Sequence, residues 1–129
     1  MDTSSPRILL AEDDRFLRRA AEATLARHGF TVLVAVDGVE ALETARTEQP
    51  DLILLDLIMP KLHGFEVLRA LKGDPATAKI PVIVLSNLGQ EADVKRALAD
   101  GACGYCIKAD LSLQELVRRV TKSLEGQPC

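Results

Sequence analysis

Residues 52–56 read Leu52-Ile53-Leu54-Leu55-Asp56, four consecutive apolar side chains followed by a carboxylate. A strand covered on one face alternates apolar and polar residues, so an unbroken apolar run indicates a strand buried on both faces. Such strands are typical of parallel sheets that carry helices on both sides. Because a lone carboxylate at the end of a buried strand is energetically costly, the sequence favours a functional role for Asp56.

Apolar runs and helical patterns alternate on both sides of this stretch. The other apolar runs are Ile8–Ala11, Thr31–Ala35, Val82–Leu85 and Tyr105–Ile107. The helical patterns run from Asp14 to Gly29, near Val39–Thr47, from Gly64 to Gly73, over Glu91–Ala99 and onward from Ser112. Five strands alternating with five helices predict an α/β fold, a flavodoxin-like (βα)5 doubly wound parallel sheet with strand order 2-1-3-4-5.

Local signals mark the ends of the first and last helical patterns. Asp14 is a good N-cap, and Gly29 suits the left-handed position after a helix. The segment Ser112-Leu113-Gln114-Glu115 matches a capping box, in which each end residue bonds the other's backbone N–H.

Length and composition limit the class of protein. The 129 residues, 47% of them apolar and 27% charged, fit one globular domain over residues 1–129. A net charge of -3 argues against general nucleic-acid binding, and no apolar stretch is long enough to span a membrane. The N-terminal residues lack a secretory signal, and three cysteines suggest no disulfide framework. We therefore expect a cytoplasmic protein with neither nucleic acid nor membrane as a direct partner.

Polar residues follow four of the predicted strands. They are Glu12 and Asp13 after the first, Asp56 after the third, Ser86 after the fourth and Lys108 after the fifth. The carboxyl ends of parallel strands share one edge of the sheet, where ligands bind at the point of strand-order reversal. Clustered carboxylates disfavour joint ionisation, so a hard cation such as Mg²⁺ would offset them. A carboxylate held beside magnesium and a lysine is placed to attack phosphorus and to form an acyl phosphate.

Four segments in order, at characteristic spacing, resemble the receiver domain of bacterial response regulators. They are Ile8–Asp14, Asp56–Pro60, Ser86 and Gly101–Lys108, and together they span nearly the whole chain. The resemblance implies a module of two-component phosphorelay signalling that catalyses only its own phosphorylation and dephosphorylation. It implies that the phosphoryl donor is a sensor histidine kinase or a phosphotransfer protein. Because the fifth helical pattern is followed almost at once by Gly126-Gln127-Pro128-Cys129, we expect a stand-alone response regulator.

The resemblance also implies a role for each site residue. Asp56 would be the phospho-acceptor. Asp13 would bind Mg²⁺ directly and Glu12 either directly or through water, with Asp56 and the backbone carbonyl of Ile58 as further ligands.

Three more residues would carry the response to phosphorylation. Lys108 would pair with the phosphoryl group, Ser86 would be the switch hydroxyl, and Tyr105 would swing inward when Ser86 moves. The switched surface, on the fourth helix, fifth strand and fifth helix, would then bind a separate downstream protein.

The chain departs from the family pattern near the site. Ala109 replaces the proline that often follows the lysine, so the Lys108–Ala109 bond is either a strained cis bond or a trans bond with a different lysine approach. Asn87 stands where a small residue is usual. Apolar Ile58 and Leu88 would position an attacking water poorly, which predicts a long-lived acyl phosphate.

Other interpretations of the same residues remain open. One alternative is a haloacid-dehalogenase-like phosphatase, which would need a second acid two residues after the nucleophile, but Ile58 stands there. Another is a receiver-like scaffold that is never phosphorylated. Such a scaffold would not need the full set of site residues, and all of them are present. Cys103 and Cys106 should face opposite sides of a strand and are interpreted as small apolar residues. Arg18 and Arg19 are interpreted as a solvated helix face.

Overall fold

The computed structural model describes residues 5–87 and 90–126 and contains one sheet of five parallel strands. The strands are β1 (Arg7–Ala11), β2 (Thr31–Ala35), β3 (Leu52–Asp56), β4 (Val82–Ser86) and β5 (Gly104–Ile107). Their order across the sheet is β2-β1-β3-β4-β5, and every neighbouring pair is parallel. The predicted flavodoxin-like topology is confirmed.

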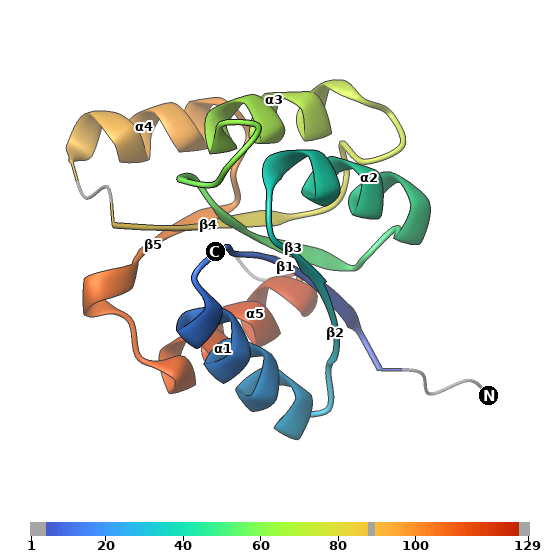
Figure 1. Ribbon diagram of the computed structural model, residues 1–129, viewed down its shortest axis with the longest axis vertical. Helices are drawn as coiled ribbons and strands as arrows, with labels where there is room; N and C mark the ends of the chain where they lie inside the picture. The colour runs from blue at the N-terminus through green and yellow to red at the C-terminus, as the bar shows by residue number, and fades with distance from the viewer. Residues whose placement is uncertain (1–4, 88–89, 127–129) are drawn as a thin grey trace.

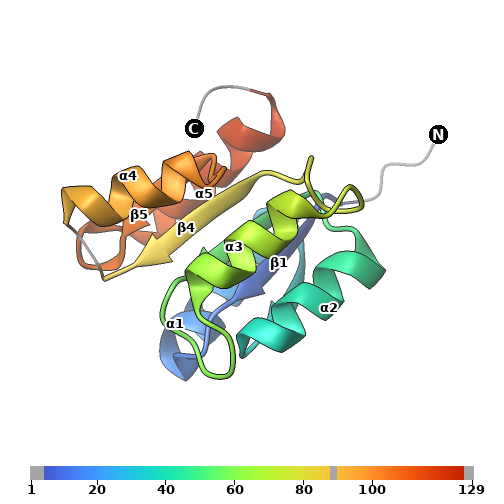
Figure 2. The same cartoon turned by 90° about the horizontal axis from the view of Figure 1, so that it is seen from above.

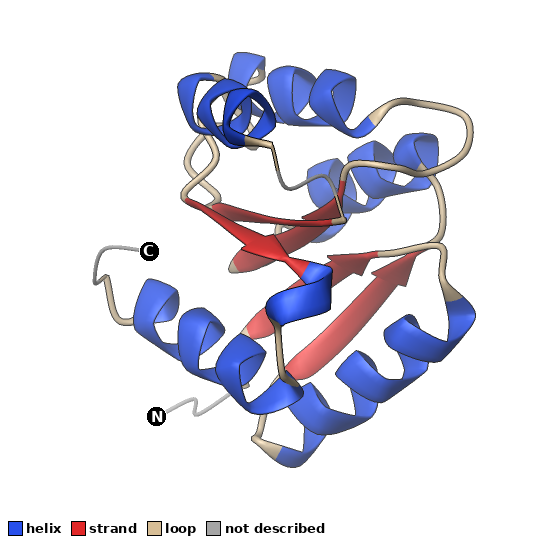
Figure 3. Ribbon diagram, turned by 90° about the vertical axis from the view of Figure 1, so that its left-hand side faces the viewer, coloured by secondary structure: helices blue, strands red, loops and turns tan. Residues whose placement is uncertain are grey.

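Helices cover both faces of this sheet (Figures 1 and 3). They are α1 (Arg15–Arg27), α2 (Gly38–Glu48), α3 (Gly64–Gly73), α4 (Glu91–Ala99) and α5 (Leu113–Leu124). Helices α1 and α5 lie on one face, and α2, α3 and α4 lie on the other. A short 3-10 helix, η1 (Lys108–Asp110), follows β5 and was not predicted from the sequence. Among the described residues, no helix is both long and apolar enough to cross a bilayer.

The sheet separates two apolar cores, which explains the unbroken apolar runs. Leu9, Ile53 and Leu55 face the core under α2 and α3. Ile8 and Leu54 face the opposite core, under α1 and α5. Because successive side chains of a strand point to opposite faces, all five residues of β3 are buried. Full burial of each Leu or Ile contributes roughly 1.5–3 kcal/mol, so the central strands are firmly held.

The helix-end signals hold with one exception. The Asp14 carboxylate accepts the backbone N–H groups of Phe16 and Leu17, and Gly29 has a φ of 91°. Ser112 Oγ accepts the N–H of Glu115 at 3.0 Å, as a capping box requires. The Glu115 carboxylate, however, accepts from Arg118 at 2.7 Å, so the reciprocal half of the predicted box is replaced by an ion pair.

Helices α3 and α4 lie beside each other on one face but are attached very differently (Figure 2). Five residues of α3 are buried, whereas α4 buries Ala97 alone. The first turn of α3 also lies directly on the chain after β3, because a Cβ on Gly64 would come within 2.7 Å of the Leu57 carbonyl oxygen.

Candidate functional site

The carboxyl ends of β1, β3, β4 and β5 meet at one edge of the sheet. Register pairs Ala11 of β1 with Leu55 of β3, so the residues that follow, Glu12 and Asp56, lie side by side. On the other side of β3, Asp56 pairs with Leu85 of β4, one residue before Ser86. Parallel pairing alone therefore brings these polar side chains together, as the sequence predicted.

Three carboxylates form the centre of the site. Glu12, Asp13 and Asp56 each offer a carboxylate oxygen, and these oxygens lie within 4.8 Å of one another. Glu12 and Asp56 are buried, whereas Asp13 is exposed. The three line a hollow of about 310 Å³, and its other lining residues are Asp14, Ile58, Asn87 and Lys108.

Lys108 holds two of the carboxylates together. Its Nζ lies 2.8 Å from Glu12 Oε1 and 3.0 Å from Asp56 Oδ2. Burial alone would lower the pKa of Lys108, but bonding to Glu12 and attraction to Asp56 outweigh it, so the pKa is raised. The Lys108–Ala109 peptide bond is trans, which decides between the two predicted alternatives. Helix η1 starts at Lys108. The Lys108 side chain reaches Glu12 and Asp56 from this position, without a cis peptide bond.

The carboxyl group of Glu12 has a strongly raised pKa. Burial raises the pKa of its carboxyl from 4.5 to about 7, and the nearby Asp56 charge adds to this effect. Lys108 and the Asp14 N–H, which donates to Oε2 at 3.0 Å, oppose the shift. Oε1 is buried and has Lys108 as its ion-pair partner, yet no described group makes an aligned hydrogen bond to it.

These residues fit a hard divalent cation. Mg²⁺ prefers oxygen ligands and usually binds proteins through one or two carboxylates while it keeps several waters. The site offers three clustered carboxylates, one with a buried oxygen that lacks an aligned hydrogen bond. The backbone N–H of Ile58 donates to Asp56 Oδ1 at 3.1 Å, which fixes the carboxylate and places Ile58 at the hollow. That the Ile58 carbonyl is a metal ligand stays a prediction.

Ser86 and Tyr105 lie in contact at the β4–β5 side of the site. Ser86 is buried, and its hydroxyl hydrogen-bonds with the phenol of Tyr105. Burial raises the pKa of Tyr105, and the charges of Asp93 and Asp56 act in the same direction, against the opposing effect of Ser86. The two residues interpreted as a switch pair are therefore neighbours. Leu88, predicted to flank the site with Ile58, lies outside the described residues.

One arginine of the site was missed. Arg18 was interpreted as part of a solvated helix face, but its Nη1 donates to the carbonyl oxygens of Glu12 and Asp13, both at 3.3 Å. Helical side chains lean toward the N-terminus, so an arginine in the first turns of α1 can reach back over the loop before it. That geometry is the signal that could have identified Arg18.

The cysteines differ from the expectation in one respect. Cys106 is free and buried, as predicted for a small apolar residue. Cys103 is disulfide-bonded, so the expectation of no disulfide is wrong there, and Cys103 and Cys106 are not bonded to each other.

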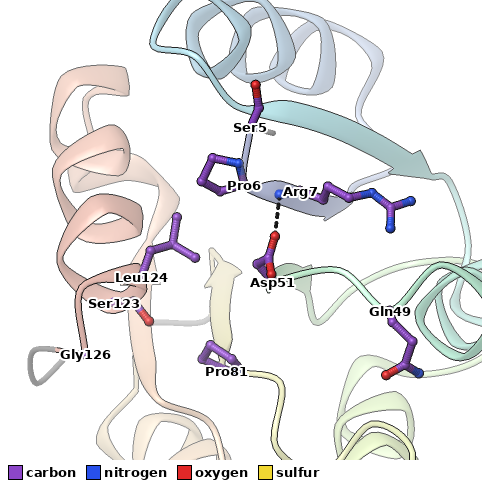
Figure 4. Close-up of a pocket in the computed structure, with 9 residues that line it drawn as sticks. All are labelled: Ser5, Pro6, Arg7, Gln49, Asp51, Pro81, Ser123, Leu124 and Gly126. Atoms are coloured by element: carbon purple, nitrogen blue, oxygen red, sulfur yellow. Dashed lines mark hydrogen bonds between the residues drawn. The ribbon is translucent and has the colours of Figure 1, made fainter. Parts of the chain in front are cut away.

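A larger hollow of about 710 Å³ lies at the opposite end of the strands (Figure 4). It borders Arg7 at the start of β1, Asp51 before β3 and Pro81 before β4. The Arg7 N–H donates to Asp51 Oδ2 at 2.7 Å, so this carboxylate is already bonded. The described residues that line this hollow include neither clustered acids nor a half-buried lysine such as Lys108. The site at the carboxyl ends of the strands therefore remains the candidate for chemistry.

Comparison with known proteins agrees with this geometry. The profile of the response regulator receiver domain family matches residues 8–121. The chain is 40% identical over 115 residues to the DNA-binding dual master transcriptional regulator RpaA of Synechocystis, and the match covers 89% of the chain and 47% of that protein. The chain spans about half or less of the length of the curated relatives that it matches.

Two solved structures extend the comparison to three dimensions. The receiver domain of the Francisella response regulator 1452 has a TM-score of 0.88 and 31% identity, covering 95% of this chain and 98% of that one. The chemotaxis protein CheY4 of Vibrio cholerae has a TM-score of 0.84 and 26% identity, covering 92% and 98%.

Proposed function

The chain belongs to the response regulator receiver domain family of two-component signalling, and we propose that it accepts a phosphoryl group onto Asp56. The donor in this proposal is the phosphohistidine of a sensor histidine kinase or a phosphotransfer protein. One observation carries the proposal: the Asp56 carboxylate is nearly buried, ion-paired with Lys108 and clustered with two further carboxylates.

The residues have complementary tasks in this transfer. An Asp56 oxygen attacks phosphorus, the P–N bond of the donor breaks, and its electron pair leaves with the imidazole. Bound Mg²⁺, held by Asp13, Asp56, Glu12 and the Ile58 carbonyl, would neutralise charge on the transferring group. The Lys108 ammonium, raised in pKa and therefore charged at neutral pH, supplies a second fixed positive charge. Receiver domains are signalling domains rather than ordinary enzymes, and the only catalysis proposed here acts on the chain itself.

Phosphorylation would then act on the surface of α4, β5 and α5. The Ser86 hydroxyl turns toward a phosphoryl oxygen and leaves the Tyr105 phenol, with which it is bonded at rest. Tyr105 lies near Asp93 of α4. Movement of Tyr105 would therefore change its contacts with α4, which has a single buried residue. A shift from 1:99 to 99:1 between two arrangements needs about 5.5 kcal/mol. Charge-assisted hydrogen bonds to Ser86 and Lys108 can supply much of it.

The output partner in this proposal is a separate protein that recognises the switched surface. Relatives include DNA-binding regulators, but this chain has a net charge of -3, which disfavours direct contact with nucleic acid. We place this signalling in the cytoplasm, where phosphohistidine donors and Mg²⁺ are available.

Incubation with acetyl phosphate and Mg²⁺, followed by intact-mass measurement, tests the proposal. We expect one phosphoryl adduct on the wild type and none on Asp56→Asn. Absence of an adduct, also with a phosphohistidine donor, would favour a scaffold that is never phosphorylated. Multiple-turnover release of phosphate from a small ester would instead favour a phosphatase.

A further inference from the structure

The loop between β1 and α1 carries two of the three clustered acids, and a side chain outside the cluster holds it in place. Nη1 of Arg18 donates to the carbonyl oxygens of two consecutive residues, Glu12 and Asp13, at 3.3 Å each. The same loop is bonded on its other side, where the N–H of Glu12 donates to the Ala35 carbonyl at 3.0 Å. The peptide that joins the two acids is therefore restrained at its carbonyl by Arg18, and the peptide before it is restrained by the Ala35 carbonyl.

The backbone contact matters most for Asp13. Glu12 is buried and its carboxylate has Lys108 and the Asp14 N–H as partners. Asp13 is exposed, and within residues 5–87 and 90–126 its carboxylate makes neither a hydrogen bond nor an ion pair. The direction of the Asp13 side chain thus depends on the orientation of its own peptide, which Arg18 restrains from the helix side.

We propose that Arg18 is a positioning residue for divalent-cation binding, which holds Glu12 and Asp13 in a geometry that can share one Mg²⁺. The inference rests on the proposed function, because it assumes that the acidic cluster binds the metal. Side chains that orient metal ligands commonly change metal affinity 10–100-fold when they are removed. Arg18 acts through backbone carbonyls rather than through the carboxylates, so we expect an effect near the lower end of that range.

The sign of the effect separates positioning from simple electrostatics. A guanidinium near a dication site repels the dication, so loss of its charge alone would tighten Mg²⁺ binding. Loss of the carbonyl contacts would free the loop and weaken binding, because the acids would have to be ordered when the metal binds. The two explanations therefore predict opposite changes after the same substitution.

Calorimetric titration with Mg²⁺ tests this directly, on the wild type and on Arg18→Met, Arg18→Lys and Arg19→Met. Arg18→Met keeps most of the aliphatic stem and removes the donors, and we expect about tenfold weaker Mg²⁺ binding. Arg18→Lys restores one donor group and should recover part of the affinity. Arg19 is exposed on the same helix, so Arg19→Met controls for loss of one positive charge and should bind Mg²⁺ as tightly as the wild type or slightly more tightly.

Phosphorylation kinetics give a second readout of the same variants. With acetyl phosphate, Arg18→Met should need about tenfold more Mg²⁺ for half-maximal rate while keeping its rate at saturating Mg²⁺. Unchanged or tighter Mg²⁺ binding by Arg18→Met would overturn the positioning role even if the wild type is phosphorylated normally. Failure of the wild type itself to bind Mg²⁺ would overturn both this inference and the proposed function. Should Arg18→Met not fold, Arg18→Leu, which also lacks side-chain donors, is measured in its place with the same criteria.

Discussion

Helices α3 and α4 lie on the same face of one sheet, yet they are fixed to it by very different amounts of buried surface. Helix α3 buries Gly64, Phe65, Val67, Leu68 and Leu71. Its N-cap, His63, accepts the Phe65 N–H and stacks on the Phe65 ring at 5.7 Å. Helix α4 buries Ala97 alone, and its N-cap residue, Gln90, makes no side-chain capping bond.

This difference divides the site into a fixed part and a part that can move. Asp56 and Ile58 lead into α3, so the predicted phospho-acceptor is supported by a well-packed segment. Ser86 leads toward α4, and Tyr105 lies near Asp93 of that helix. Segments with few buried apolar contacts open at lower free energy than the core does. The proposed phospho-acceptor, Asp56, is thus attached to the firmly packed α3, whereas the proposed switch residues, Ser86 and Tyr105, adjoin the loosely packed α4.

The sharpest test applies the same substitution to both helices. Leu68 of α3 has no exposed surface, whereas Leu98 of α4 is 47% exposed. Leu68→Ala should lower the free energy of unfolding by about 2–5 kcal/mol, because it leaves a cavity. Leu98→Ala should change it by less than about 0.5 kcal/mol. Urea denaturation measures the free energy of unfolding of both variants. Equal losses would contradict the stronger attachment of α3 to the sheet.

Two glycines of α3 test whether its first turn is the fixed end. Gly64→Ala places a methyl group against the Leu57 backbone, and we expect a loss of about 1–3 kcal/mol from overpacking. Gly73 at the other end has nothing within 4 Å of an added Cβ, so Gly73→Ala should be neutral or stabilising by up to about 1 kcal/mol. Thermal unfolding compares the pair. A tolerated Gly64→Ala would contradict the close approach of α3 to Leu57.

The pH dependence of stability tests the fixed part at Glu12. Its pKa rises from 4.5 when unfolded to about 7 when folded, so the folded chain binds more protons between these values. The contribution of Glu12 is therefore greatest below pH 4.5 and is lost as pH rises toward 7. The slope is at most about 1.4 kcal/mol per pH unit. Urea denaturation without divalent cations should reveal it, and Glu12→Gln should remove it.

The smallest expected effect concerns the attachment of α4 to α3. The Arg96 guanidinium lies 3.9 Å from the centre of the Phe65 ring, so a cation–π contact joins α4 to α3. Arg96→Ala should lower global stability by only about 0.5–1 kcal/mol. Amide exchange in α4 should accelerate more than in α3, and Lys95→Ala, at an exposed neighbour, serves as the control. Equal acceleration in both helices would show that α4 does not open separately.

The sequence predicted the strand order and the convergence of polar side chains at one edge of the sheet, for a common reason. Strand order and the convergence of Glu12, Asp56 and Lys108 follow from apolar periodicity and from parallel pairing, which are properties of the backbone. The contacts that were missed or wrongly predicted belong to long side chains with several possible partners. The Arg18 side chain donates to two carbonyl oxygens instead of facing solvent. The Glu115 carboxylate accepts from Arg118 instead of from the backbone of its own helix cap. Rotamer choice of this kind depends on neighbours that periodicity does not specify.

The bond between Ser86 and Tyr105 has a spectroscopic consequence. The chain contains one tyrosine and no tryptophan. Its near-ultraviolet absorbance and intrinsic fluorescence therefore come overwhelmingly from the phenol that rests against the Ser86 hydroxyl. A rearrangement that changes the surroundings of the Tyr105 phenol therefore changes the optical signal of the whole protein, and it can be followed without an attached dye.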